Sequence, residues 1–225
     1  MLVKNWMNTS VITIDADDSM DSAIKLLKQH HIRMLPVMGK NKLVGIVTDR
    51  DLKRASASDA TSLDIHELNY LLSNIKIRDI MTKDPITVPL DYTVEETAQI
   101  LLKHKISGVP VVDDYGQMKG IITQSDLFRI LISLTGVESK GIQFGIEVED
   151  RPGSIKEITD TIRAHGGRLV SVLTSYNMAP KGYRRVYIRM FGIDRFKIHR
   201  LKEAVAQKAS LLYMVDHRDK GRETF

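Results

Sequence analysis

Apolar positions along the first 136 residues follow the same pattern twice. In each pass a short apolar run predicts a strand, and apolar residues three or four apart then predict a helix. Two further apolar runs predict strands before a closing helix. The ranges in the first pass are 11–14, 20–31, 34–38, 43–48 and 49–55. Those in the second pass are 85–88, 94–105, 108–112, 119–124 and 125–134. Ser19 and Thr93, residue types that favour helix N-caps, precede the first helix of each pass.

Identical residues at matching positions show that this pattern is an internal duplication. The offset is 74 before a predicted turn and 75 after it, because the second copy has one extra turn residue. A β-α-β-β-α unit of this size buries too little surface alone, so we expect the two copies to pack about a pseudo-two-fold axis. The matched pairs are Met7/Met81, Thr13/Thr87, Leu27/Leu101, His30/His104, Ile32/Ile106, Pro36/Pro110, Gly45/Gly120, Thr48/Thr123, Asp51/Asp126 and Leu52/Leu127.

The segment between the copies has a weaker pattern. Its start is rich in Ser, Ala and Asp and predicts a loop, whereas apolar residues at 65, 68, 71 and 72 predict a short amphipathic helix. His66 and Glu67 on this helix could contact a ligand or a metal. A solvated outer face explains them better, and we favour it.

The C-terminal third predicts a different unit. Strands are expected over residues 142–150, 168–177, 184–193 and 210–218, and amphipathic helices over 151–167 and 194–208. The order β-α-β-β-α-β is the ferredoxin-like split arrangement, so the whole chain is α+β. Pro152 is placed at the start of the first of these helices, and residues 219–225 are expected to fray.

Composition narrows the class of protein. The 225 residues are 43% hydrophobic, enough for real cores, and contain no cysteine and no apolar run of membrane-spanning length. The first residues lack a secretory signal, so we expect a cytoplasmic protein. Residues 1–138 carry a net charge of −2 and residues 139–225 carry +7. A basic face of this kind attracts nucleic acid in some proteins, but a solvated basic face is the favoured interpretation.

The duplicated unit resembles the cystathionine-β-synthase (CBS) domain, and two in tandem resemble a Bateman module. The resemblance rests on "HIRMLPVMGKNKLVGIVTDRDL" and "HKISGVPVVDDYGQMKGIITQSDL". The third unit, with "EDRPGSIKEITDTIRAHGG", resembles an ACT domain. The arrangement of all segments is similar to that of the acetoin-utilization protein family. The expected boundaries are 1–58 for the first CBS repeat, 59–75 for the insert, 76–136 for the second repeat and 140–217 for the ACT domain.

The repeated Thr-x-x-Asp suits an adenine nucleotide. A carboxylate at a helix start can accept hydrogen bonds from both ribose hydroxyls, and a Thr hydroxyl with free helix amides suits phosphate. The alternative is that Asp51 and Asp126 only satisfy backbone amides at helix ends. The resemblance implies a nucleotide site in one or both clefts between the copies. The implied residues are Ser10, Val11, Ile12, Arg33, Met34, Leu35, Pro36, Thr48, Arg50, Asp51, Asp84, Pro85, Ile86, Ser107, Gly108, Val109, Pro110, Thr123, Ser125 and Asp126.

The two copies differ where the ligand would bind. Arg50 stands where the second copy has Ser125, and Arg33 where it has Ser107. Arginine favours phosphate, so the first copy is expected to bind the phosphate end. The expected ligand is AMP, ADP or ATP, with NAD or S-adenosylmethionine as further candidates, and Mg²⁺ is expected only on the nucleotide phosphates.

The ACT resemblance implies an amino-acid site at one loop, and pure dimerisation is the alternative, slightly favoured. The loop residues are Asp150, Arg151, Pro152, Gly153 and Ser154.

The sequence contains no catalytic motif and no metal-ligand spacing, so we expect a regulatory homodimer with a protein partner rather than an enzyme. Its output would concern acetoin or acetate metabolism. Nucleic-acid binding, or a purely dimerising scaffold, through the basic third is the alternative function.

Overall fold

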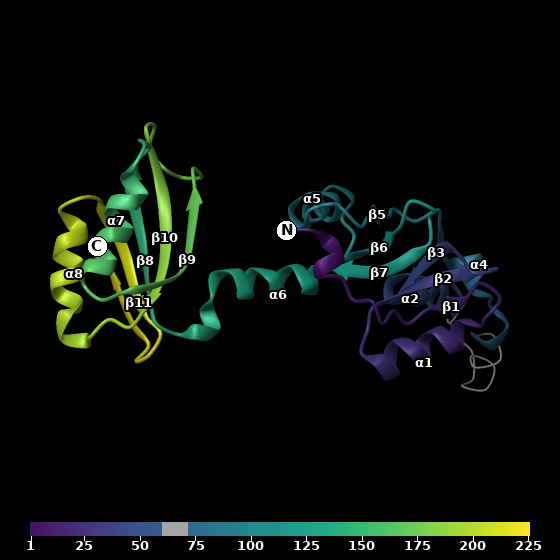
Figure 1. Cartoon of the computed structure of the whole chain (residues 1–225). Coiled ribbons are helices and arrows are strands. Elements are labelled where there is room, and N and C mark those ends of the chain that lie inside the picture. The colour runs from purple at the N-terminus through teal and green to yellow at the C-terminus, as the bar shows by residue number, and fades with distance from the viewer. Residues whose placement is uncertain (60–71) are drawn as a thin grey trace. The chain divides into compact units, whose positions relative to one another are not determined.

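The computed structural model describes residues 1–59 and 72–225. The chain divides into two compact units, Met1–Phe128 and Arg129–Phe225, and each is described by itself (Figure 1). The helix predicted around His66 and Glu67 lies outside the described residues, apart from residues 72–74, which are helical.

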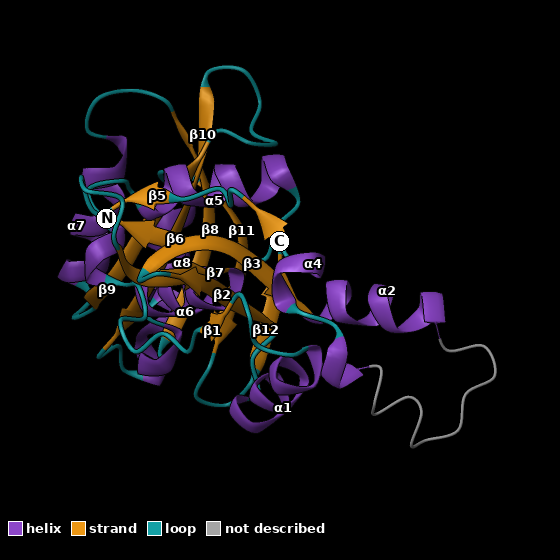
Figure 2. Cartoon of the chain, turned by 90° about the vertical axis from the view of Figure 1, so that its right-hand side faces the viewer, coloured by secondary structure: helices purple, strands orange, loops and turns teal. Residues whose placement is uncertain are grey.

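Both repeats of the first unit have the predicted β-α-β-β-α order (Figure 2). The first strand of each repeat is only two residues long and pairs in parallel with the second, so residues 11–13 form no regular strand. The first repeat contains β1 (Ile14–Asp15), α1 (Met20–His30), β2 (Met34–Gly39), β3 (Lys42–Thr48) and α2 (Asp49–Asp59). The second contains β5 (Val88–Pro89), α5 (Val94–His104), β6 (Gly108–Val112), β7 (Met118–Thr123) and α6 (Gln124–Thr135).

The predicted helix N-caps are confirmed. The Ser19 hydroxyl accepts the Ser22 backbone N–H at the start of α1. At the start of α5, Thr93 accepts the Glu96 N–H while the Glu96 carboxylate accepts the Thr93 N–H, so both donors are satisfied in a capping box.

The segment before each repeat packs on the other repeat. The strand β4 (Thr82–Lys83) and the helix α4 (Ile77–Ile80) precede the second repeat, yet β4 pairs with β3 and Ile77 lies in the core of the first repeat. In the same way the 3-10 helix η1 (Val3–Asn5) precedes the first repeat and bonds to the second, where the Val3 N–H donates to the Tyr92 carbonyl. Asn8 and Ile121 form the equivalent bridge. The repeats are therefore tied together by an exchange of segments.

Two glycines make this exchange possible. A Cβ on Gly45 would lie 2.5 Å from the Met81 sulfur, and a Cβ on Gly120 would lie 2.6 Å from the Met7 sulfur. Each methionine comes from the exchanged segment, so the close approach requires glycine at both positions. A small buried cluster of Met34, Ile46 and Ile121 joins side chains of the two repeats.

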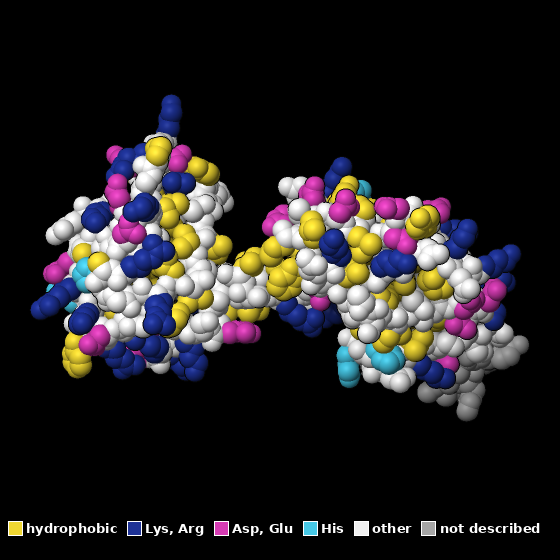
Figure 3. Space-filling model, in the orientation of Figure 1, with side chains coloured by type: hydrophobic (Ala, Val, Ile, Leu, Met, Phe, Trp, Pro, Cys, Tyr) yellow, Lys and Arg dark blue, Asp and Glu magenta, His cyan; other side chains and the backbone are white. Residues whose placement is uncertain are grey.

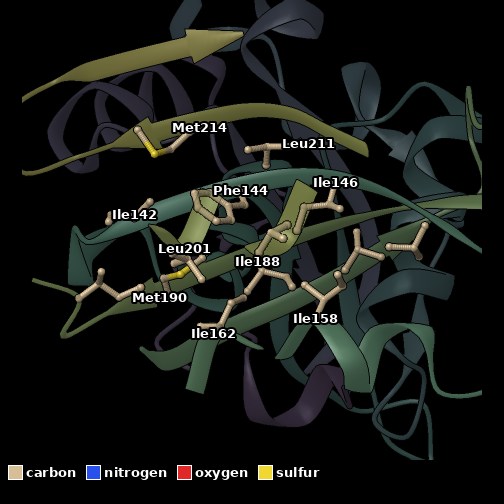
Figure 4. Packing of buried hydrophobic residues seen from close by; sticks show 14 residues of the cluster. Ile142, Phe144, Ile146, Ile158, Ile162, Ile188, Met190, Leu201, Leu211 and Met214 are labelled. Carbon is tan, nitrogen blue, oxygen red and sulfur yellow. The ribbon is translucent and has the colours of Figure 1, made fainter. Parts of the chain in front are cut away.

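The second unit is an antiparallel sheet with the strand order β12 (Gly221–Thr224), β11 (Ser210–Asp216), β8 (Ile142–Glu149), β10 (Tyr183–Phe191) and β9 (Arg168–Ser175). The order β11-β8-β10-β9, with two helices, is the split β-α-β-β-α-β arrangement predicted from sequence. The core lies between the sheet and the helices, where Phe144 and Ile188 meet Ile158 and Leu201 (Figure 4). The elements are η2 (Val137–Ser139), β8 (Ile142–Glu149), α7 (Ser154–Ala164), β9 (Arg168–Ser175), β10 (Tyr183–Phe191), η3 (Arg195–Lys197), α8 (Ile198–Ala206) and β11 (Ser210–Asp216).

The prediction for the C-terminal tail was wrong. Residues 219–225 do not fray throughout, because β12 (Gly221–Thr224) pairs antiparallel with β11. All four β12 residues are exposed, so no apolar alternation marks the strand in the sequence. The free backbone edge of β11 supplies the pairing, and Lys220 takes the positive φ that the turn needs.

None of the described helices is both long enough and apolar enough to cross a membrane.

Candidate functional site

The predicted nucleotide residues gather at the starts of α2 and α6. In the first repeat Met34 is paired with Thr48, and the Asp49 N–H donates to the Arg33 carbonyl at 3.0 Å. We call Arg33, Met34, Thr48, Arg50 and Asp51 the first site.

The second repeat has the same arrangement. Gly108 is paired with Thr123, and the Gln124 N–H donates to the Ser107 carbonyl at 2.9 Å. We call Ser107, Gly108, Thr123, Ser125 and Asp126 the second site.

The Thr and Asp of each site cap their helix. The Thr48 hydroxyl donates to Asp51 Oδ2 at 2.6 Å, and the Asp51 N–H returns a hydrogen bond to the Thr48 hydroxyl at 3.3 Å. Thr123 and Asp126 repeat this at 2.6 and 3.4 Å. The interpretation of the motif as a helix cap is thereby confirmed, and a role in ligand binding stays a prediction.

The cap also orients the Asp51 carboxylate. One oxygen is held by both the backbone N–H and the hydroxyl of Thr48, while the other lies 3.2 Å from Nη2 of Arg54. Arg54 is an exposed side chain, and pairs of this kind are weak in water. Two vicinal hydroxyls could therefore displace Arg54 from an oxygen that is already positioned.

Charge distinguishes the two sites. Arg33 and Arg50 are exposed in the first site, and within residues 1–59 and 72–225 neither side chain makes a hydrogen bond or ion pair. The second site has the exposed hydroxyls of Ser107 and Ser125 at these positions. The first site can thus offer two guanidinium groups to an anion without breaking an existing pair.

Some residues of the predicted nucleotide site have buried side chains and can offer a ligand only their backbone. Leu35 and Val109 are fully buried, and Leu35 packs in the core of its own repeat. Pro36 and Pro110 are buried as well. Their side chains are therefore unavailable to a ligand unless the surrounding residues move.

The connecting segments have separate positions. The Ser10 N–H donates to Asn8 Oδ1, and Val11 packs against the cluster of Met34, Ile46 and Ile121, while Ile12 packs against the core of the first repeat. Asp84 has a positive φ, Pro85 is half-buried and Ile86 is 36% exposed.

An apolar groove that the sequence did not predict lies between α1 and α2. Its volume is about 540 Å³, and among the predicted site residues only Arg33 lines it. Ile24, Leu27 and Leu52 form much of its wall. The apolar helix positions were visible in the sequence, but the space between the helices was not.

The equivalent positions of the second repeat carry exposed apolar side chains. Leu102 and Phe128 are 74% and 63% exposed, and they occupy the positions of Lys28 and Lys53, which line the groove. Figure 3 shows apolar side chains gathered where α6 lies.

The predicted amino-acid loop is held by ion pairs. Arg151 donates to both oxygens of Glu157 at 2.8 Å and to Glu149 at 3.1 Å. These bonds lower the pKa of Glu157 and raise that of Arg151. Pro152 does not begin the helix as predicted, because α7 starts at Ser154 with Gly153 as its N-cap.

Two further features belong to this loop. Asp150 Oδ1 accepts a hydrogen bond from the Tyr176 hydroxyl at 3.4 Å and lies 3.5 Å from Nε of Arg184. Arg151 and Ser154 line a cavity of about 610 Å³ that also contains Lys202. The cavity wall carries both acidic and basic side chains.

Four arginines of the basic second unit do not form one basic face. Arg189 is 4% exposed and donates to the carbonyls of Thr135 and Lys140, and burial lowers its pKa. Arg184 and Arg185 are partly buried beside acidic residues, whereas Arg200 is exposed on α8. Their scatter discounts a contiguous nucleic-acid surface built from them.

Among residues 1–59 and 72–225, no group of three or more His, Asp and Glu is arranged to hold a metal ion.

Comparison with known families matches the CBS domain twice, at residues 3–58 and 77–133. Among curated proteins, the inosine-5′-monophosphate dehydrogenase of Korarchaeum cryptofilum is 38% identical over 127 residues. That match covers 56% of this chain but only 23% of the dehydrogenase.

Several solved structures with CBS domains are similar to the chain, among them the following three. The CBS domain pair of protein MJ0100, in complex with 5′-methylthioadenosine and S-adenosyl-L-methionine, is 36% identical with a TM-score of 0.50, covering 58% of this chain and 99% of that one. CBSX2 in complex with AMP is 28% identical with a TM-score of 0.50, covering 58% and 96%. A Vibrio cholerae protein assigned to acetoin utilization (AcuB) is 28% identical with a TM-score of 0.52, covering 63% and 97%.

Proposed function

The chain belongs to the CBS-domain family, as a tandem pair, and from this premise we propose that it is a regulatory protein that binds an adenine nucleotide at the first site. One observation carries the proposal. The oriented Asp51 carboxylate and the guanidinium groups of Arg33 and Arg50, which have no partner among residues 1–59 and 72–225, belong to one site at the start of α2.

Each group has a chemical role. Asp51 accepts the ribose hydroxyls, because its cap directs one oxygen away from the helix amides. Arg50, together with the start of α2, binds phosphate. The backbone of β2 forms the wall against the base.

The relatives support this ligand class. AMP is bound by CBSX2, and 5′-methylthioadenosine and S-adenosyl-L-methionine are bound by the CBS pair of MJ0100. All three contain adenosine, so a site for the ribose and base is the shared requirement. Binding by this chain, and the choice among AMP, ADP, ATP, NAD and S-adenosylmethionine, is part of the proposal.

The second unit is proposed to be an ACT domain that responds to the bound nucleotide. Its β-α-β-β-α-β order supports this assignment. A ligand shifts the protein between two states only by binding one of them more tightly. By similarity to the Vibrio cholerae protein, the output is AcuB-like and acts through a protein partner in acetoin or acetate metabolism. The loop 150–154 is proposed as an amino-acid site.

Calorimetric titration tests the nucleotide proposal. The wild-type protein is titrated with AMP, ADP, ATP, NAD and S-adenosylmethionine. Arg50→Ala is expected to weaken binding of the preferred nucleotide about tenfold, the size of one lost charge-assisted hydrogen bond. Ser125→Ala is the matched control, because it truncates the equivalent position of the second repeat. Absence of heat with all five ligands would sink the nucleotide proposal.

We also propose that the chain forms a homodimer through the first unit. In this proposal the exposed apolar side chains of Leu102 and Phe128 enter the groove between α1 and α2 of a second copy, where the aliphatic stems of Lys28 and Lys53 pack on the Phe128 ring. A two-fold arrangement makes this contact twice and closes the dimer. Sedimentation equilibrium should show a dimer that Phe128→Asp dissociates. A wild-type protein that stays monomeric at a concentration of roughly tens of micromolar would contradict this proposal.

A further inference from the structure

Met34 and Gly108 occupy equivalent positions in the two repeats but differ greatly in volume. Each is the first residue of its strand and is paired with the Thr of its site, Met34 with Thr48 and Gly108 with Thr123. One site therefore has a long thioether side chain where the other has none.

The Met34 side chain reaches from the first repeat to the second site. A Cβ on Gly108 would lie 2.8 Å from the Met34 sulfur and 3.0 Å from Cγ2 of Thr123. The sulfur and the Thr123 methyl group therefore crowd the same point beside Gly108. Met34 is only 8% exposed and belongs to the buried cluster with Ile46 and Ile121, so other side chains hold it there.

The reverse contact does not exist, since glycine has no side chain to extend toward Thr48. The base of a nucleotide in the second site would have to lie beside Gly108 and Thr123, which is the position that the Met34 sulfur takes. In the first site the corresponding position beside Thr48 receives nothing from Gly108. The arginines follow the same division, because Arg33 and Arg50 belong to the first site.

From this geometry we infer that the chain binds nucleotide at the first site alone and that Met34 closes the second. The inference rests on the proposed nucleotide binding and names the residue that limits it. Met34 acts on the number of occupied sites, because its side chain fills the space beside Gly108 and Thr123.

The test counts the binding sites. Calorimetry with the nucleotide that the wild type prefers is expected to give about one molecule per chain, and Met34→Ala about two, because the substitution empties the volume beside Gly108. Met34→Leu is the control that retains the bulk and is expected to keep a single site. Circular dichroism and thermal unfolding establish that each variant is folded.

Photolabelling assigns the sites. With 8-azido-AMP as the probe, the wild type should be labelled only on peptides of the first site, and Met34→Ala on peptides of both. The double variant Met34→Gly with Gly108→Met should move the label to the second site, because the methionine side chain determines which site is open. Binding should be weaker than in the wild type, because Arg33 and Arg50 remain in the first site.

The outcomes separate this inference from the proposed function. Two wild-type sites, or a single site retained in Met34→Ala, would overturn the role of Met34 and leave nucleotide binding standing. Failure of the wild type and of every variant to bind any of the five adenosine ligands would overturn both.

Discussion

The two repeats of the first unit share the same helix cap and the same glycine contact, but they differ in the side chains around these features. The Thr–Asp hydrogen bond at the helix start measures 2.6 Å in both. Each repeat also has a glycine against which a methionine from the exchanged segment packs. Around these constant features, Met34 is replaced by Gly108, and Arg50 by Ser125.

This difference separates structural from ligand-binding requirements. A cap and a close packing contact tolerate few residues, so the two copies keep them. The positions that differ are exposed, as at Arg50, or lie between the repeats, as at Met34. A duplicated fold can therefore contain two unequal sites without any change in backbone topology.

The exchange of segments offers the largest test of the comparison. Val3→Ala and Ile77→Ala should each cost roughly 2–4 kcal/mol, because both side chains are fully buried. Each substitution should loosen the repeat on which its side chain packs. Val3→Ala should loosen the second repeat, and Ile77→Ala should loosen the first. Amide hydrogen exchange by mass spectrometry would locate the change.

Faster exchange in residues 14–48 for Val3→Ala would contradict the crossed arrangement. The two variants serve as controls for each other, because their positions are equivalent and only the affected repeat should differ.

The glycines test whether the two frames are equally tight. Gly45→Ala and Gly120→Ala should each destabilise the first unit by about 1–3 kcal/mol, since the added Cβ meets a methionine sulfur and a backbone oxygen within 3.0 Å. Urea unfolding gives both values. A neutral effect at one glycine alone would show that its exchanged segment can move away.

The helix caps should give a smaller and equal effect. Asp51→Ala and Asp126→Ala each remove a carboxylate oxygen that accepts hydrogen bonds from the N–H and the hydroxyl of the Thr three residues earlier, and about 1 kcal/mol of unfolding free energy is expected at each position. Asp→Asn variants are the controls, because the amide oxygen can still accept. If only one position mattered, the frames would not be equivalent.

The smallest effect distinguishes the α1 and α5 caps by pH. Hydrogen bonds from the Thr93 N–H and hydroxyl lower the pKa of Glu96, whereas the equivalent residue of α1 is Ser22, which carries no charge. A lowered pKa stabilises the folded state above the unfolded value of about 4.3, and this contribution is lost as the pH falls through the folded value.

Unfolding followed from pH 6 down to pH 3, with both limits approximate, should therefore show a slightly steeper loss of stability in the wild type than in Glu96→Gln. Ser22→Ala should leave the pH dependence unchanged. Equal slopes for the wild type and Glu96→Gln would indicate that the capping box does not persist in solution.

Short-range patterns explain why much of the fold was predictable. The caps at Ser19 and Thr93 link residues three apart, and the helix and strand periods are properties of neighbouring residues. Duplication then allowed one repeat to support the assignment of the other. Residues 219–225 were mispredicted because β12 has no apolar face, and only its pairing with β11 makes it a strand.

The candidate site was predictable by residue type but not by arrangement. Arg33, Arg50 and Asp51 were identified from the differences and identities of the two copies. The burial of Leu35 and Val109, the groove beside α1 and the reach of Met34 to Gly108 were not.

The sequence by itself determined the repeat, the order of elements and the capped helix starts, because each depends on residues close together in the chain. Only the tertiary structure decided that Val3 packs on the second repeat, that Ile77 packs on the first, and that Met34 lies beside Thr123. These contacts join residues from distant segments of the chain, and a periodic pattern carries no information about which distant surfaces meet. The sequence alone shows that the two sites differ at Arg50 and Ser125, and the packing of the repeats adds the contact of Met34 with Gly108.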